Sequence, residues 1–196
     1  MSDYQFDTYH VVLGNPRHVQ QVESASNKDK AEIRQALDEL PLLLGQDKWV
    51  LTGGLCIPAT TGTIVRRHGD IDVGIETTVF PEVAQRILNE RYGLFTRTFM
   101  NHTSRTEKMD IYRALTPEKA LKPGIKNLRF VRVDQRGKIV RHERLLDYLD
   151  VYLYDRKGEE IECREDGLRS PATWNQGRTY TTAGGQIFGL RDLKFI

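Results

Sequence analysis

The sequence has few cysteines and no long apolar run, which excludes several classes of protein. Its two cysteines among 196 residues, Cys56 and Cys163, lie far apart and form no C-x-x-C pair. No apolar run approaches the roughly 20 residues that span a bilayer. The first residues also lack the basic and apolar segments of a signal peptide. We therefore expect a cytoplasmic protein with two free thiols and no membrane association.

An excess of charge of one sign is also missing, since 29 basic residues face 27 acidic ones and the net charge is +2. This balance does not by itself indicate a nucleic-acid-binding protein, although nucleic acid stays open as a partner. Between residues 126 and 144, basic residues clearly outnumber Asp134 and Glu143. This basic segment is either a solvated hairpin or a positive wall beside a polyanionic substrate. It comprises Lys126, Arg129, Arg132, Arg136, Lys138, Arg141 and Arg144.

What is present is the composition of a globular chain, with 39% hydrophobic and 29% charged residues. The length favours a single domain over residues 1–196, with its core at about 28–163. Residues 1–27 show little beyond a strand-like run at 9–13. The segment 167–196 is rich in polar residues and glycine, and we expect it to be largely irregular.

Hydrophobic periodicity predicts helices over residues 28–44, 55–64 and 81–92. Asn27 is the expected N-cap of the first helix, and Pro41 is expected to kink or end it. Strand-like runs lie at 49–51, 70–75, 94–99, 127–133, 148–154 and 160–163. These patterns predict an α+β fold in which helices flank a mixed sheet.

Two aspartates two residues apart carry the chemistry that the sequence suggests. Asp70 and Asp72 fall in a strand-like run, so both side chains lie on one face of the strand, opposite Ile71 and Val73. Paired carboxylates of this kind suit Mg²⁺, and two ions flanking a phosphorus atom favour transfer of a nucleotidyl group. We therefore expect Asp70 and Asp72 to bind magnesium.

A third carboxylate is needed from another strand, and two candidates exist. Asp150 lies in the strand-like run Tyr148–Tyr154, where a charged residue on a sheet requires a partner. Asp110 is the alternative. We favour Asp150, which would bind metal and accept the proton of the attacking hydroxyl as general base.

A glycine pair precedes the aspartates and is suited to phosphate. Gly53 and Gly54 let the backbone approach a triphosphate closely, and the following helix offers free N–H groups. Thr52 adds a hydroxyl, while Arg66 and His68 can reach phosphate or stabilise the turn. Glycine pairs and Asp-x-Asp pairs are each common alone, but their joint arrangement is specific.

These residues resemble a known group. Leu51-Thr52-Gly53-Gly54 followed by Arg66-x-His68-x-Asp70-x-Asp72 is similar to the signature of the DNA polymerase β-like nucleotidyltransferases. Within that superfamily, the motif is most similar to the lincosamide and aminoglycoside nucleotidyltransferases. The resemblance implies a polymerase β-like fold and Mg²⁺-dependent transfer of a nucleoside monophosphate from an NTP to a hydroxylated acceptor. It further implies that the glycines contact the triphosphate and that the three aspartates bind metal.

The acceptor is the part that the sequence leaves open. Antibiotic-modifying relatives often carry a helical C-terminal domain, which residues 167–196 are too few to form. A homodimer that completes the acceptor site, or a different acceptor, would account for this. The hypotheses are therefore transfer to a small antibiotic, toxin-like transfer to tRNA or protein, and a non-catalytic nucleotide-binding module.

Overall fold

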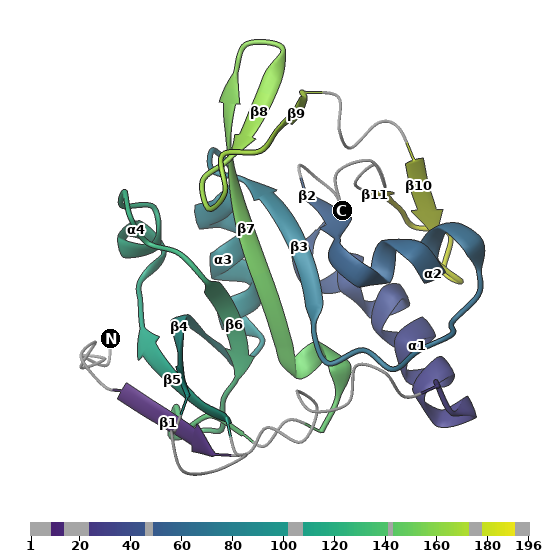
Figure 1. Cartoon of the computed structure of the whole chain (residues 1–196), viewed down its shortest axis with the longest axis horizontal. Coiled ribbons are helices and arrows are strands. Elements are labelled where there is room, and N and C mark those ends of the chain that lie inside the picture. The colour runs from purple at the N-terminus through teal and green to yellow at the C-terminus, as the bar shows by residue number, and fades with distance from the viewer. Residues whose placement is uncertain are drawn as a thin grey trace.

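The computed structural model describes residues 9–13, 24–45, 49–101, 108–140, 143–172 and 178–190 (Figure 1). Within these ranges the strands form one mixed sheet in the order β1-β5-β4-β6-β7-β3-β2-β11-β10, and β8 and β9 extend it from β7. The strands are β1 (Tyr9–Leu13), β2 (Trp49–Thr52), β3 (Ile71–Glu76), β4 (Tyr92–Asn101), β5 (Lys108–Ala114), β6 (Leu128–Arg132), β7 (Tyr148–Lys157), β8 (Glu160–Cys163), β9 (Arg169–Pro171), β10 (Arg178–Thr181) and β11 (Ile187–Leu190).

The helices of the described ranges are few and short apart from the first. They are α1 (Asn27–Leu44), α2 (Cys56–Thr61), α3 (Phe80–Asn89) and α4 (Pro117–Ala120), with 3₁₀ turns at Gly53–Leu55 and Leu145–Asp147. A mixed sheet with few helices is compatible with the α+β class that the sequence predicts. No helix of the described residues has the length and apolar character required to cross a bilayer.

Helix α1 shows where local sequence rules worked and where they did not. Ser26, rather than the predicted Asn27, is the N-cap: its hydroxyl accepts from the Asp29 N–H, and the Asp29 carboxylate accepts from the Ser26 N–H. Pro41 does not end the helix, which continues to Leu44. Pro41 costs only one hydrogen bond there, and the Gly45 N–H caps the end by donating to the Pro41 carbonyl over 2.8 Å.

Two other boundaries also differ from the prediction. Helix α3 ends at Asn89, so Tyr92 and Gly93 open β4 instead of closing the helix. Arg91 makes this change of direction with a left-handed φ of 63°. The segment expected to be largely irregular contributes β9, β10 and β11, and β11 pairs in parallel with β2 through Gly189 and Val50.

Alternation along the central strands separates a core face from a polar face. On β3, Ile71, Val73 and Ile75 are fully buried, as the strand period predicted. On β7, Leu149, Val151 and Leu153 join the same cluster, which leaves the intervening side chains on the opposite face. The polar residues of the central strands therefore lie together on one side of the sheet.

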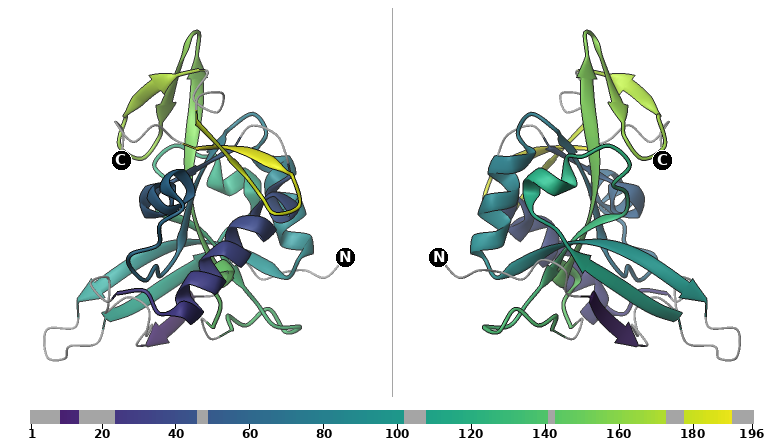
Figure 2. Two further views of the ribbon diagram at one scale, coloured as in Figure 1. Left: turned by 90° about the vertical axis from the view of Figure 1, so that its right-hand side faces the viewer. Right: turned by 90° about the vertical axis from the view of Figure 1, so that its left-hand side faces the viewer.

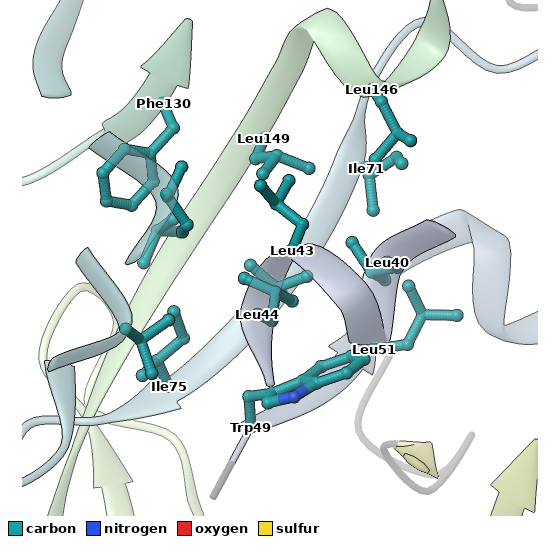
Figure 3. Packing of buried hydrophobic residues seen from close by; sticks show 14 of the residues in the cluster. Leu40, Leu43, Leu44, Trp49, Leu51, Ile71, Ile75, Phe130, Leu146 and Leu149 are labelled. Atoms are coloured by element: carbon teal, nitrogen blue, oxygen red, sulfur yellow. The ribbon is translucent and has the colours of Figure 1, made fainter. Parts of the chain in front are cut away.

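The core face packs against α1 and α3. Leu40 and Leu44 of α1 lie beside Ile71, Ile75 and other sheet residues (Figure 3). Phe80 and Phe130 contribute a tilted ring pair, with centroids 6.3 Å apart. This packing anchors β3 and β7 from behind and so positions their polar side chains.

Replacing Leu40 by alanine is expected to destabilise the fold by about 2–5 kcal/mol, because it leaves a cavity in a packed core. Leu40 is 0% exposed, whereas Leu42 on the same helix is 68% exposed. Leu42→Ala is therefore the matched control and should stay within about 0.5 kcal/mol of the wild type. Urea denaturation followed by circular dichroism measures both values, and equal losses in the two variants would contradict the packing described here.

Beyond the core, β7 runs on into an arm made of β7, β8 and β9, which projects from one end of the molecule in both side views (Figure 2). Exposed ion pairs lie along it: Lys157 contacts Glu162 at 2.8 Å, and Arg169 contacts Glu162 at 2.9 Å. Such solvated pairs contribute little stability each. Cys163, at the base of the arm, and Cys56, next to the glycine pair, are both buried and are not joined by a disulfide, as expected.

Candidate active site

The register of the sheet brings the predicted residues into one row across four strands. Thr52 on β2 lies opposite Asp72 on β3, which lies opposite Asp150 on β7, which in turn lies opposite Arg129 on β6. Residues that oppose one another across neighbouring strands project to the same face. The backbone alone therefore places a hydroxyl, two carboxylates and a guanidinium side by side.

The alternative, Asp110, lies on a strand outside this row. Asp110 belongs to β5, and β4, β6 and β7 lie between β5 and β3. Asp150, in contrast, lies on a direct neighbour of β3. The arrangement therefore favours Asp150 as the third carboxylate.

Arg129 donates hydrogen bonds to both Asp70 and Asp150. Its Nε and Nη2 donate to the two carboxylate oxygens of Asp150, and Nη2 also donates to Asp70 Oδ2 over 3.1 Å. The Arg129 side chain is 1% exposed, whereas those of Asp70 and Asp150 are 30% and 21% exposed. This fork–fork geometry makes a strong charge-assisted pair. In the sequence alone, Arg129 is only one of several basic residues between 126 and 144.

Three basic residues of this segment lie beside carboxylates. Arg132 lies over the Tyr92 ring and 3.9 Å from Asp147, and Arg144 pairs with Glu39 at 2.7 Å. Arg129 points into the carboxylate cluster instead. Arg141 falls outside the described residues.

The surroundings of Asp72 favour its protonated form. Burial raises its pKa from the ordinary 3.8 to about 8, and the charges of Asp70 and Asp150 add to that shift. Arg129 and a hydrogen bond from Tyr152 oppose it. Tyr152 was not foreseen as a site residue, although its place two residues after Asp150 puts it on the same face.

The Gly53-Gly54 turn lies close to this cluster, and there is no room between them for a side chain at Gly53. Gly53 has a left-handed φ of 64°, and a Cβ there would overlap the Asp72 carboxylate. A Cβ on Gly54 would lie 2.5 Å from Arg66 Nη2 and 3.1 Å from His68 Cε1. Asp72, Arg66 and His68 thus lie directly against the turn.

The helix predicted after the glycines is present in two pieces, a 3₁₀ turn at Gly53–Leu55 and then α2. The neighbouring His68 is a neutral imidazole at physiological pH. Burial lowers its pKa to about 4, and the charge of Arg66 contributes to that effect. The positive charge on this side of the turn therefore comes from Arg66.

A cavity of about 190 Å³ adjoins the row on the side of Asp150. Asp150 and Tyr152 form one part of its wall, and Arg97, Asn127 and Glu165 form others. Burial raises the pKa of Glu165, and the charge of Asp150 contributes. The cavity places open space directly beside the carboxylate that the sequence suggests as a general base.

The donor set suits a hard divalent cation bound together with a substrate. In the part of the chain that the structure describes, no three His, Cys, Asp or Glu side chains already surround a single point. Mg²⁺ does not require such a cage, since it commonly takes one or two carboxylates and completes its shell with water and substrate phosphates. Asp70 and Asp72 are two such oxygen donors. Burial and the neighbouring carboxylates raise the pKa of Asp72, and a bound cation would favour its ionised form.

Without metal, the protein is expected to lose stability as the pH rises from about 4 to about 8, by at most about 1.4 kcal/mol per pH unit. The folded-state pKa of Asp72 lies above its ordinary value. Its contribution is therefore complete at low pH and is lost as the carboxyl is forced to ionise. Urea denaturation in a chelator at several pH values measures this slope. Subtracting the slope measured for Asp72→Asn removes the contribution of all other titrating groups. Equal slopes in the wild type and in Asp72→Asn would contradict the assignment of the raised pKa to Asp72.

Comparison with known proteins identifies part of the chain. No curated protein matches it significantly. Residues 32–117 match the family model described as Aminoglycoside-2''-adenylyltransferase, a range that contains the glycine pair and the Asp-x-Asp pair but ends before Arg129 and Asp150. Over this range the chain is similar to nucleotidyltransferases of the aminoglycoside-resistance type, in agreement with the resemblance of its motif.

Proposed function

We propose that this chain is an Mg²⁺-dependent nucleotidyltransferase of polymerase β-like fold that transfers a nucleoside monophosphate from an NTP to a hydroxyl of a small acceptor. The observation that carries the proposal is the row of Thr52, Asp72 and Asp150 beside the Gly53-Gly54 turn. The family model that matches residues 32–117 supports nucleotidyl transfer and, by its description, an aminoglycoside as acceptor.

In this proposal the glycine turn holds the triphosphate. The backbone N–H groups that follow Gly53 face the phosphates, and Arg66 adds positive charge from the other side of the turn. Asp70, Asp72 and Asp150 would hold the magnesium, for which two ions are expected. Bound magnesium would neutralise the phosphate oxygens and the leaving pyrophosphate.

The acceptor hydroxyl then approaches from the cavity beside Asp150. Its oxygen forms a bond to the α-phosphorus while the bond from that phosphorus to the bridging oxygen of pyrophosphate breaks. Asp150 accepts the hydroxyl proton. The reaction needs little covalent chemistry from the protein and depends on position and charge.

Incubating the protein with Mg²⁺, each NTP and a panel of acceptors tests this proposal through the release of pyrophosphate. The panel contains aminoglycosides, lincosamides, tRNA and a protein mixture. Release that depends on an aminoglycoside supports the proposal, whereas release only with tRNA or protein favours the toxin-like alternative. Binding of NTP without release with any acceptor would indicate a non-catalytic module. Sedimentation velocity on the same sample tests the predicted homodimer.

A further inference from the structure

Arg129 is the feature of this site that the proposed reaction leaves unexplained. It is buried on β6, directly opposite Asp150, and its guanidinium is shared between Asp150 and Asp70. A buried arginine with this many contacts cannot swing out to solvent without leaving a buried charge uncompensated. Arg129 therefore stays within the carboxylate cluster when a metal enters.

The charges of the cluster show what this arginine does. Asp70, Asp72 and Asp150 repel one another, and Arg129 is the cation in direct contact with two of them. Both oxygens of Asp150 already accept from Arg129. Since each carboxylate oxygen has a second lone pair, a metal can still bind Asp150, but it must share that carboxylate with the guanidinium.

We propose that Arg129 is a built-in cation that holds Asp70 and Asp150 together in the metal-free protein and competes with the divalent metal for Asp150. The inference rests on the proposed metal site. Arg129 is a positioning residue in this account, since it acts on the substrate only through the carboxylates. Its charge stabilises the carboxylate cluster when no metal is bound and lowers the affinity of that cluster for a divalent metal.

Calorimetric titration of Mn²⁺ without nucleotide tests this inference on the wild type, Arg129→Met and Arg129→Lys. Removing the competing charge in Arg129→Met is expected to tighten Mn²⁺ binding about tenfold, while the metal-free melting temperature falls. Mg²⁺ should then raise the melting temperature of this variant by more than it raises that of the wild type. Arg129→Lys keeps the charge with a single nitrogen and should fall between the two.

Arg132→Met is the matched control, because Arg132 lies on the same strand, over the Tyr92 ring. Its Mn²⁺ affinity should equal that of the wild type. A purely structural Arg129 would lower the melting temperature equally with and without Mg²⁺ and would leave Mn²⁺ affinity unchanged or weaker. Either result would overturn the inference. If Arg129→Met does not fold, the test uses Arg129→Lys. Mn²⁺ binding by Arg129→Lys that is no tighter than binding by the wild type refutes the proposal.

Failure of this inference differs from failure of the proposed function. Suppose that Mn²⁺ affinity changes in the Arg129 variants as expected, but no acceptor causes release of pyrophosphate from an NTP. This result contradicts the transfer reaction alone. Pyrophosphate release with Mn²⁺ affinity indifferent to Arg129 contradicts the competition alone. Absence of Mn²⁺ binding in the wild type and in both variants contradicts the competition alone, because the proposed reaction binds magnesium together with the NTP.

Discussion

Asparagine at position 72 is expected to lower the rate of nucleotidyl transfer by about three orders of magnitude or more while leaving the fold intact. Asp72 lies at the centre of the row, between Thr52 and Asp150, and a neutral amide there removes one metal ligand. Asp70→Asn is expected to have the same effect. Because the pKa of Asp72 is raised by burial and by its acidic neighbours, Asp72→Asn should also melt at a higher temperature than the wild type without metal.

Single-turnover assays with labelled NTP measure the rate, and circular dichroism melts in a chelator measure the stability. Asp134→Asn is the control, since Asp134 lies on an exposed turn and accepts backbone N–H groups that asparagine can also satisfy. Turnover persisting in either site variant would refute the assignment of metal to the Asp-x-Asp pair.

Alanine at position 53 is expected to abolish productive triphosphate binding and to destabilise the protein by about 1–3 kcal/mol. Two causes combine here. The left-handed φ of 64° strains any side chain, and the new Cβ would overlap the Asp72 carboxylate. The carboxylate would have to move, so nucleotide binding and metal binding should both weaken.

Gly62→Ala separates these two causes. Gly62 also has a left-handed φ, of 70°, but no atom lies within 4 Å of a Cβ placed there. It should therefore reproduce the strain without the overlap, losing stability but retaining turnover and nucleotide affinity. Fluorescence titration with a labelled NTP and thermal melts measure both quantities. Equal turnover in Gly53→Ala and Gly62→Ala would show that close approach at Gly53 is unimportant.

Much of the site was predictable because its parts follow local rules. The period of a strand predicts Asp70 and Asp72 on one face, and the strand-like run around Asp150 favours this residue as the third carboxylate. The seven segments expected to be strands all are strands. These predictions needed only spacing and the cost of placing a charge on a sheet.

The remaining features depend on contacts between distant segments. Arg129 looked like one of several surface cations, and only the pairing of β6 with β7 reveals its two carboxylate partners. Tyr152 lay within a predicted strand, but nothing local indicated its hydrogen bond to Asp72. The strand β11 was missed because a short run within a polar, glycine-rich segment carries a weak pattern.

The parallel pairing of β11 with β2 has a consequence for the order in which the chain folds during synthesis. Strand β2, which leads into the glycine turn, is translated more than a hundred residues before Gly189 and Leu190 come to lie beside Val50 and Leu51. Pairings between such distant segments form slowly, and an unpaired apolar strand is prone to aggregation until they do. Until Leu190 has been translated, the nascent protein therefore carries an unpaired edge of β2 next to the Gly53-Gly54 turn. Chaperones that shield strand edges should matter most during that interval.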